Sequence, residues 1–303
     1  MSDLLGIFVN NLLPILLISG CGFLLARYLH LEPRSLGRII FYVLYPVLVL
    51  DLLMRNHLSV EAILKTSGYT TLLLLVCGIL AWLAGRLLKL ERPALVSVIL
   101  TSVFANCGNY GLPLISFAFG QDALAYGTIF YITTAILFNT AGVLIASMGQ
   151  MTFKQAFLGL IKVPTIYGIL VAVVLIQTGW KLPLPVERTV SLLSGAAIPS
   201  MLLLLGMELQ RAQWTKNIKA VSISTGIRLV IGPLLGLVLT GLFGLQGPAR
   251  MAAVVEASMP AAVMNTVLAS EYQLDAPLVT SIVFVSTLLS PLTLTPLLFL
   301  LGK

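Results

Sequence analysis

The sequence predicts an all-α integral membrane protein with ten transmembrane helices, arranged as two inverted repeats of five, in which the fourth and ninth helices are broken. Three observations predict this fold: the composition, the length of the apolar runs, and two interruptions at corresponding places. Hydrophobic residues make up 58% of the chain and charged residues only 10%, and the mean hydropathy is +1.03. Soluble domains carry about 25% charged residues, so this chain could not hide its apolar surface from water.

The apolar runs have the length of membrane-spanning helices. Each is about 20 residues long and lacks the strict alternation of transmembrane β-strands. No Lys or Arg precedes Arg27, so we expect the first run to be a span and not a secretory signal. The ten spans are predicted at 4–29, 36–55, 68–88, 93–118, 122–148, 154–178, 186–209, 217–243, 248–270 and 276–301.

The orientation is predicted from Lys and Arg in the connections, which are too short to hold a soluble domain. Eleven lie on one side of the predicted spans: Arg27, Arg34, Arg38, Arg86, Lys89, Arg92, Lys154, Lys162, Arg211, Lys216 and Lys219. Six lie on the other: Arg55, Lys65, Lys181, Arg188, Arg250 and Lys303. This distribution predicts a multi-pass protein of the bacterial cytoplasmic (inner) membrane with both termini extracytoplasmic. The basic charge is then a topology signal, and no nucleic-acid partner is expected.

The two halves of the chain repeat each other. Asp122 and Asp275 each open a span and lie 153 residues apart, and Pro46 and Pro199 are separated by the same distance. We therefore divide the chain into a first five-helix repeat at 1–150 and a second at 151–303. Because five is an odd number, the second repeat enters the membrane in the opposite sense, and such inverted repeats place their substrate site near the bilayer midplane.

The fourth span is interrupted between Asn106 and Pro113. Gly108 and Gly111 weaken a helix there, and Pro113 lacks an amide donor and biases its predecessor away from helical dihedral angles. Unwound backbone at membrane depth is tolerated only where protein or a polar cavity satisfies its hydrogen-bonding groups. The break therefore predicts a binding site.

The ninth span has a corresponding break. Pro260 follows Glu256 and Ser258 in mid-span, and it is expected to end the first half-helix near Ser258. Two crossing broken helices present two half-helix N-termini, whose free amides and partial positive charge suit an anion such as a carboxylate. The half-helix C-termini, with free carbonyls, suit a cation or a protonated donor.

Four segments carry a resemblance to a known family: Asn106–Ile115, Ser258–Pro260, Ala269–Leu274 and Pro291–Leu294. Over these residues the chain resembles the auxin efflux carriers, a family within the bile/arsenite/riboflavin transporter superfamily that includes plant carriers and bacterial permeases for malate and related acids. The resemblance implies a ten-span homodimeric carrier, with spans one, two, six and seven as a scaffold and the crossed helices in a domain that moves like an elevator. It also implies that Asn106 contacts a substrate carboxylate.

The chain departs from the plant members in two places. It lacks their long central loop between spans five and six, and it carries Glu256 just before the ninth-span crossing. The candidate substrate-binding residues are Asn106, Gly108, Asn109, Gly111, Pro113, Met259, Pro260 and Asn265. The alternative for the asparagines is that they cap unwound helix ends, and the glycines and prolines are expected to shape the backbone more than to contact a ligand.

The candidate coupling residues are Glu256, Thr128, Thr133 and Arg228. A carboxylate at membrane depth costs about 2.5 to 3.5 kcal/mol on insertion scales, which favours a functional role for Glu256 as a cation or proton site. One alternative is a structural ion pair between Glu256 and Arg228; another is that Arg228 helps to hold the substrate anion. Na⁺ or H⁺ is the expected coupling ion, with no other cofactor and no metal site beyond a Na⁺ position beside Glu256.

These observations predict a secondary active transporter of a small organic anion, a mono- or dicarboxylate such as a malate-like or auxin-like acid. Its partners are then a small carboxylate, membrane lipid and a second copy of the chain. A sodium-coupled symporter of the bile-acid type and an anion channel are the alternatives. No enzymatic activity is predicted, because His30 and His57 both lie outside the spans, which leaves no intramembrane nucleophile and base.

Overall fold

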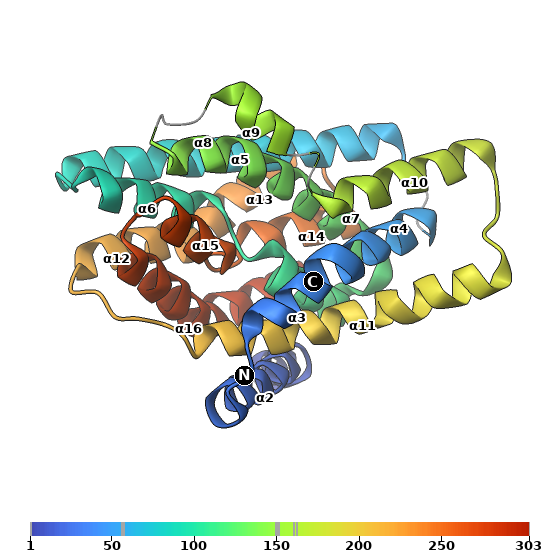
Figure 1. The fold of residues 1–303 in the computed structure, drawn as a ribbon, viewed down its shortest axis with the longest axis horizontal. Helices are drawn as coiled ribbons and strands as arrows, with labels where there is room; N and C mark the ends of the chain where they lie inside the picture. Colours follow the sequence, from blue (N-terminus) through green and yellow to red (C-terminus); the bar gives the residue numbers. More distant parts are fainter. Residues whose placement is uncertain (1, 56–57, 149–151, 160, 162, 303) are drawn as a thin grey trace.

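A computed structural model describes residues 2–55, 58–148, 152–159, 161 and 163–302. Over these residues every regular element is a helix, and the β structure is limited to one isolated bridge between Ala105 and Ala261. Most helices run alongside one another, parallel to the long axis of the molecule (Figure 1). The domain boundary expected between residues 150 and 151, and two of the residues used for orientation, Lys162 and Lys303, lie outside the described residues.

Many helices contain a five-residue π-turn, labelled η. The first half contains α1 (Ser2–Ile7), η1 (Phe8–Leu12), α2 (Leu13–Leu29), α3 (Pro33–Ile39), η2 (Ile40–Leu44), α4 (Tyr45–Arg55), α5 (Val60–Leu87), α6 (Arg92–Val103), η3 (Cys107–Gly111), α7 (Leu112–Leu137), η4 (Phe138–Gly142) and α8 (Val143–Ala146). The second contains α9 (Phe153–Gly159), α10 (Pro164–Thr178), α11 (Leu184–Leu209), α12 (Ile218–Gly226), η6 (Ile227–Ile231), α13 (Gly232–Leu242), α14 (Gly247–Ala257), α15 (Met264–Glu271) and α16 (Ala276–Leu301).

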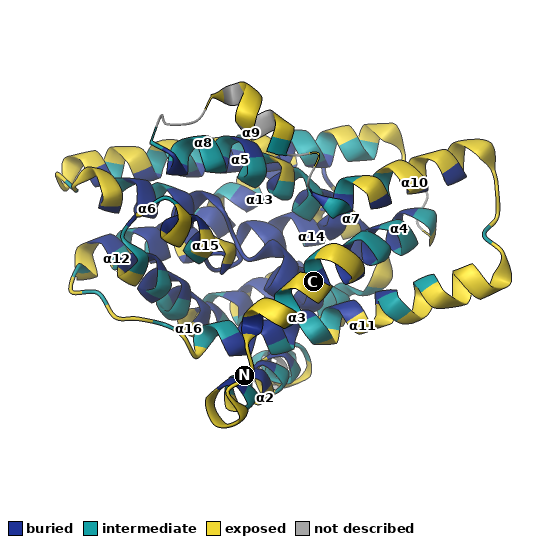
Figure 2. Ribbon diagram, viewed as in Figure 1, coloured by how far each residue is buried: buried dark blue, intermediate teal, exposed yellow. Residues whose placement is uncertain are grey.

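The described helices are those of a multi-pass membrane protein. Seven helical segments are long and apolar enough to cross a bilayer: Leu4–Leu29, Pro33–Arg55, Val60–Leu87, Cys107–Ala146, Leu184–Leu209, Ile218–Leu242 and Ala276–Leu301. Two shorter apolar helices are Arg92–Val103 and Pro164–Thr178. Large apolar side chains such as Leu170 and Val174 on α10 are exposed, and exposed residues cover the outer helices in Figure 2. In a bilayer this surface faces lipid.

Three boundaries of the predicted membrane spans lie elsewhere in the structure or are located more closely by it. The span expected at 154–178 is wrong as one helix, because Val163 is extended and Pro164 starts α10; proline lacks the amide that a continuous helix needs there. The span expected to begin at residue 68 begins at Val60, where the Ser59 hydroxyl caps α5 by accepting from the Ala62 amide at 3.1 Å. Gly120, with φ of +75°, separates the expected fourth and fifth spans within the segment assigned to α7.

The two halves of the chain meet closely where α2 crosses α11. A Cβ on Gly22 would lie 2.9 Å from the Leu203 Cα, and one on Gly206 would lie 2.8 Å from the Phe23 amide nitrogen. Small residues permit this backbone approach, and close packing of this kind replaces the hydrophobic drive that is missing between helices in lipid. These helices therefore form a tightly packed pair.

Helix α14 lies at the centre of the molecule, where burial is greatest (Figure 2). Its residues Ala252 to Ala257 are at most 1% exposed. The Tyr69 hydroxyl of α5 lies 3.2 Å from both the Ala253 and the Gly236 carbonyl oxygens, so it ties α14 to α13. This packing fixes the end of α14 that carries Glu256.

Candidate functional site

The fourth-span break lies earlier than the sequence predicted. Helix α6 ends at Val103, residues 104–106 are non-helical, and Cys107–Gly111 forms a π-turn that continues into α7. The expectation that the break extends from Asn106 to Pro113 is therefore wrong beyond Asn106. The wider π-turn joins the Leu112 amide to the Cys107 carbonyl, five residues back, and this register accommodates the missing amide of Pro113 in the first turn of α7.

The ninth-span break has the predicted position, since α14 ends at Ala257 and α15 begins at Met264. The two breaks pair with each other in antiparallel fashion. The Asn106 amide donates to the Pro260 carbonyl at 2.8 Å, and the Ala262 amide donates to the Phe104 carbonyl at 2.9 Å. Non-helical backbone of each break thus satisfies that of the other, as the apolar surroundings require.

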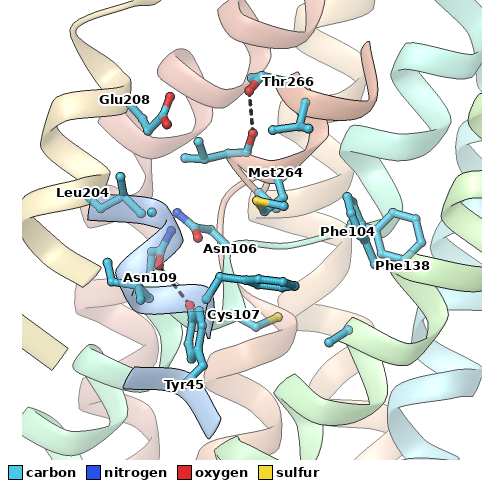
Figure 3. A pocket seen from close by; sticks show the side chains of 18 of the residues that line it. Tyr45, Phe104, Asn106, Cys107, Asn109, Phe138, Leu204, Glu208, Met264 and Thr266 are labelled. Carbon is cyan, nitrogen blue, oxygen red and sulfur yellow. Dashed lines mark hydrogen bonds between the residues drawn. The ribbon is translucent and has the colours of Figure 1, made fainter. Parts of the chain in front are cut away.

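A cavity of about 840 Å³ lies beside the crossing. Its deep wall is formed by the buried segment from Phe104 to Asn109, and its lining extends to the exposed Arg34, Arg38 and Arg211. Figure 3 shows Asn106, Asn109 and Tyr45 around this cavity, with Met264 and Thr266 of α15 above them. The cavity therefore connects the crossing with one surface of the protein.

Both half-helix N-termini face the cavity. Gly108 and Asn109 begin the helix that contains η3 and α7, while Val263 and Met264 begin α15, and all four residues line the cavity. The first amides of a helix have no intrahelical acceptor and carry a partial positive charge. Asn106 is 4% exposed, and its side-chain Nδ2 has no hydrogen-bond partner among the described residues. These donors together suit an anion.

Aromatic side chains complete the cavity wall. The Tyr45 ring stacks on that of Tyr131 with centroids 4.8 Å apart, and the Tyr45 hydroxyl donates to Asn109 Oδ1 at 2.9 Å. Phe104 packs edge-on against Phe138 at 5.1 Å. Sequence reasoning missed these aromatic residues, and no signal beyond the neighbouring Pro46 marked Tyr45. They would surround the apolar body of a ligand whose charged group lies at Asn106.

The half-helix C-termini meet the guanidinium of Arg228, which is fully buried on η6. Its Nε donates to the Met259 carbonyl at 3.0 Å, Nη2 to the Ala257 carbonyl at 3.1 Å and Nη1 to the Ser102 carbonyl at 3.2 Å. The alternative that Arg228 forms an ion pair with Glu256 is wrong within the part of the chain described, whose ion pairs lie elsewhere.

Glu256 is fully buried one residue before the end of α14. Neither of its carboxylate oxygens has a hydrogen-bond partner among the described residues. Two glycines of the other half make room for it: a Cβ on Gly111 would overlap the carboxylate, and one on Gly127 would lie 3.5 Å from Oε1. Glu256 does not line the cavity, so its carboxyl group is enclosed.

Of the residues predicted to bind substrate, some line the cavity and the others are packed in the protein interior. Gly111, Pro113, Met259, Pro260 and Asn265 are buried and lie outside the cavity lining, whereas Asn106, Gly108 and Asn109 belong to it. Asn265 Nδ2 donates to the Phe104 carbonyl at 3.1 Å, which ties α15 to the fourth-span break.

The two threonines predicted to assist coupling bond within or between helices. The Thr128 hydroxyl donates to the Leu124 carbonyl at 2.8 Å, one turn back along α7. The Thr133 hydroxyl lies 3.1 Å from Ser67 Oγ, at the contact between α7 and α5. Neither residue lines the cavity.

Comparisons with known proteins show the family to which the chain belongs. The chain matches the family described as membrane transport protein over residues 7–156 and 147–298. It is 28% identical to an uncharacterised transporter of Methanothermobacter thermautotrophicus, over 87% of each chain. It is 25% identical to a protein of Rhizobium meliloti provisionally named a malonate transporter, over 92% of this chain and 91% of the relative. It is also 30% identical to auxin efflux carrier component 6 of Arabidopsis thaliana, over 43% of this chain and 24% of the carrier.

The family match covers nearly the whole chain, and the relatives named for a function are transporters. A crossing of two broken helices beside a cavity is the arrangement in which membrane carriers hold their substrates. The chain is a membrane transporter that belongs to the membrane transport protein family, the family of the auxin efflux carriers.

Proposed function

We propose that the protein is a secondary active transporter of a small organic anion with at least one carboxylate. The observation that carries the proposal is the unpartnered Nδ2 of Asn106, buried at the point where two half-helix N-termini face one cavity. An amide donor beside free backbone amides would bind a carboxylate through several hydrogen bonds. The name of the Rhizobium meliloti relative supports a carboxylate substrate.

The proposed transport cycle is alternating access. The ten helical spans form two inverted five-helix repeats in this proposal, and the crossing helices move like an elevator against a scaffold that includes the closely packed α2 and α11. The pairing of Asn106 with Pro260 supports movement of the two broken helices as one body. The protein is proposed to act as a homodimer, in which the scaffolds of two copies form the fixed part.

The proposed location is the bacterial cytoplasmic membrane, with both termini outside. Contacts at the two ends of the helices support the predicted sides: Arg211 pairs with Glu32 at 2.7 Å at the more basic end, and Arg55 donates to Ser191 at 3.1 Å at the other. The cavity lining reaches the surface at the more basic end. With positive residues inside, this conformation would be open to the cytoplasm.

Glu256 is the proposed coupling residue. Because an ionised carboxylate without partners is costly in a dry site, the enclosed conformation favours its neutral, protonated form. A conformation that opened this site to water or to a cation would favour the ionised form. Such a difference between two states is what couples a cation gradient to a conformational change.

Purified full-length protein, screened for thermal stabilisation by mono- and dicarboxylates and then reconstituted for uptake assays, tests the proposal. The parent should be stabilised by the active carboxylate and should take it up saturably, with exchange against substrate preloaded inside the vesicles. Asn106→Ala should weaken this stabilisation at least about tenfold in ligand concentration, because a hydrogen bond to a charged group contributes about 1.5 to 3 kcal/mol.

The control is Asn11→Ala, which removes only a local bond from Asn11 to the Ile7 carbonyl, away from the cavity. Equal ligand affinity of the parent and Asn106→Ala would reject the assignment of the anion site. Flux that neither saturates nor exchanges would indicate an anion channel.

A further inference from the structure

We propose that Arg228 is a built-in cation at the crossing that takes the place of a coupling Na⁺, so that the transporter works without sodium and Glu256 is left to exchange protons. This inference rests on the proposed function for its transport consequence only. The position of Arg228 is a property of the fold: a fully buried guanidinium contacts the C-terminal ends of both α6 and α14.

The charges at this point balance without a metal ion. The C-terminus of a helix carries about half of a negative elementary charge on its unpaired carbonyls. Helices α6 and α14 both end here, and Ser102 and Ala257, from their last turns, present carbonyl oxygens to Arg228. Two such ends sum to about one negative charge, which a single guanidinium neutralises. A Na⁺ added to the same carbonyls would meet an uncompensated positive charge.

The hydrogen bonds of Arg228 also occupy the carbonyl oxygens that a Na⁺ would need as ligands. Half-helix C-termini and unwound carbonyls are the groups that coordinate Na⁺ in carriers with broken helices. Here the carbonyl oxygens of Ser102, Ala257 and Met259 each accept from a different nitrogen of Arg228, at 3.0 to 3.2 Å. Every guanidinium nitrogen thus has a backbone acceptor. The three carbonyl oxygens are hydrogen-bonded to a side chain that, unlike a bound ion, cannot dissociate.

Glu256 is therefore the carboxyl group that, among the described residues buried near the crossing, we propose to exchange a cation. The Cys107 thiol on η3 contacts its carboxylate, the Arg228 guanidinium on η6 acts on it electrostatically, and Glu256 in turn acts on Tyr45 of α4. The Tyr69 hydroxyl of α5, which packs against α14, is engaged with carbonyl oxygens. The described residues hold no cluster of three or more metal-ligating side chains, and no second carboxylate is among the groups that act on Glu256. We therefore assign a proton as its exchangeable cation.

The first experiment uses the parent protein. Its melting temperature in detergent is measured in choline chloride and in NaCl of equal ionic strength, with and without the best carboxylate ligand. We expect no difference beyond about 1 °C, whereas a specifically bound Na⁺ well above its dissociation constant would raise the melting temperature by several degrees. In proteoliposomes, replacement of Na⁺ by choline should leave uptake unchanged, and an imposed pH gradient should change it. Sodium-dependent stabilisation or uptake would overturn the proposal.

The second experiment removes the built-in cation. Arg228→Ala should melt at lower temperature than the parent, and millimolar guanidinium chloride or NaCl should raise its melting temperature relative to choline chloride. Neither salt should stabilise the parent. The control is Arg211→Ala, whose side chain is exposed and pairs with Glu32; this variant should show no cation rescue. If Arg228→Ala is too unstable to purify, Arg228→Lys is compared with Arg228→Met, and only the charged residue should support folding.

An Arg228→Ala protein as stable as the parent, or an Arg228→Met protein as stable as Arg228→Lys, would contradict the role of the charge. Failure of every carboxylate to bind the parent would count against the proposed function but would leave the cation measurements valid. The two proposals therefore fail separately.

Discussion

The backbone amide of Asn106 donates a 2.8 Å hydrogen bond to the carbonyl oxygen of Pro260, across 154 positions of the chain. This bond joins the break of one half to the break of the other. It places the N-terminal ends of two half-helices at the cavity, while Arg228 neutralises their C-terminal counterparts. One side of the crossing is thus the proposed anion site, and the other holds the guanidinium of Arg228.

Loss of the Asn265 side chain should weaken the crossing. Asn265→Ala removes its bond to the Phe104 carbonyl and leaves a buried acceptor with one partner fewer. We expect destabilisation by about 1 to 3 kcal/mol, measured as a lower melting temperature. Asn11→Ala, which removes a local bond in the first helix, is the control and should change stability less. Equal effects of the two substitutions would show that Asn265 does not brace the crossing.

Gly111→Ala should disturb Glu256 directly. Its Cβ would overlap the carboxylate, and overpacking of this kind costs about 1 to 3 kcal/mol. We expect impaired transport and a lower melting temperature. Gly111→Ala combined with Glu256→Ser should be less destabilised than the sum of the single changes, because the shorter side chain relieves the overlap. Gly226→Ala, whose Cβ would meet nothing within 4 Å, is the control. Strict additivity would contradict the contact.

Tyr45→Phe should reduce ligand affinity without unfolding the protein. The change removes the hydroxyl that donates to Asn109 Oδ1 and retains the ring stacked on Tyr131. A hydrogen bond of this kind contributes about 0.5 to 1.5 kcal/mol, so the concentration of carboxylate needed for half-maximal stabilisation should rise severalfold. Tyr28→Phe, at a residue 69% exposed, is the control. Unchanged affinity in Tyr45→Phe would indicate that Asn109 needs no fixed orientation.

The helix pair α2–α11 should not tolerate added bulk. In Gly22→Ala the new Cβ would overlap the Leu203 carbonyl oxygen and lie 2.8 to 2.9 Å from the carbonyl carbon and Cα of Leu203, and we expect destabilisation by about 1 to 3 kcal/mol. Gly20→Ala is a matched control in the same helix, since its Cβ would have open space. Comparison of the two melting temperatures checks the prediction, and a Gly22→Ala protein as stable as Gly20→Ala would disprove the close crossing.

The exposed arginines at the cavity mouth should accelerate anion entry. Arg34→Gln combined with Arg38→Gln should lower the initial uptake rate severalfold at low salt, and this difference should shrink at high salt as the charges are screened. Arg86→Gln combined with Lys89→Gln is the control, because both residues are exposed but do not line the cavity. A rate loss that does not depend on ionic strength would point to a structural role for the arginines.

Much of the fold and part of the site could be predicted from the chain. The breaks near Asn106 and Pro260 were predicted because glycine, asparagine and proline interrupt apolar runs, and the end of α14 near Ser258 followed from the chemistry of proline. The predicted extent of the fourth-span break, from Asn106 to Pro113, was wrong beyond Asn106, since a π-turn is set by hydrogen-bond register and has no clear sequence pattern. The aromatic wall was missed because tyrosine and phenylalanine are ordinary in membrane helices.

The sequence by itself determined that this protein lies in a membrane as a set of helices and that two of those helices are broken, because hydropathy and backbone chemistry are local properties. Only the tertiary structure decided what the buried charged residues contact. Arg228 and Glu256 had been predicted as an ion pair or as joint coupling residues, and the fold directs the arginine to backbone carbonyls and encloses the carboxylate against Gly111 and Gly127. Partners far apart in the chain are chosen by helix packing, which no local pattern of residues records.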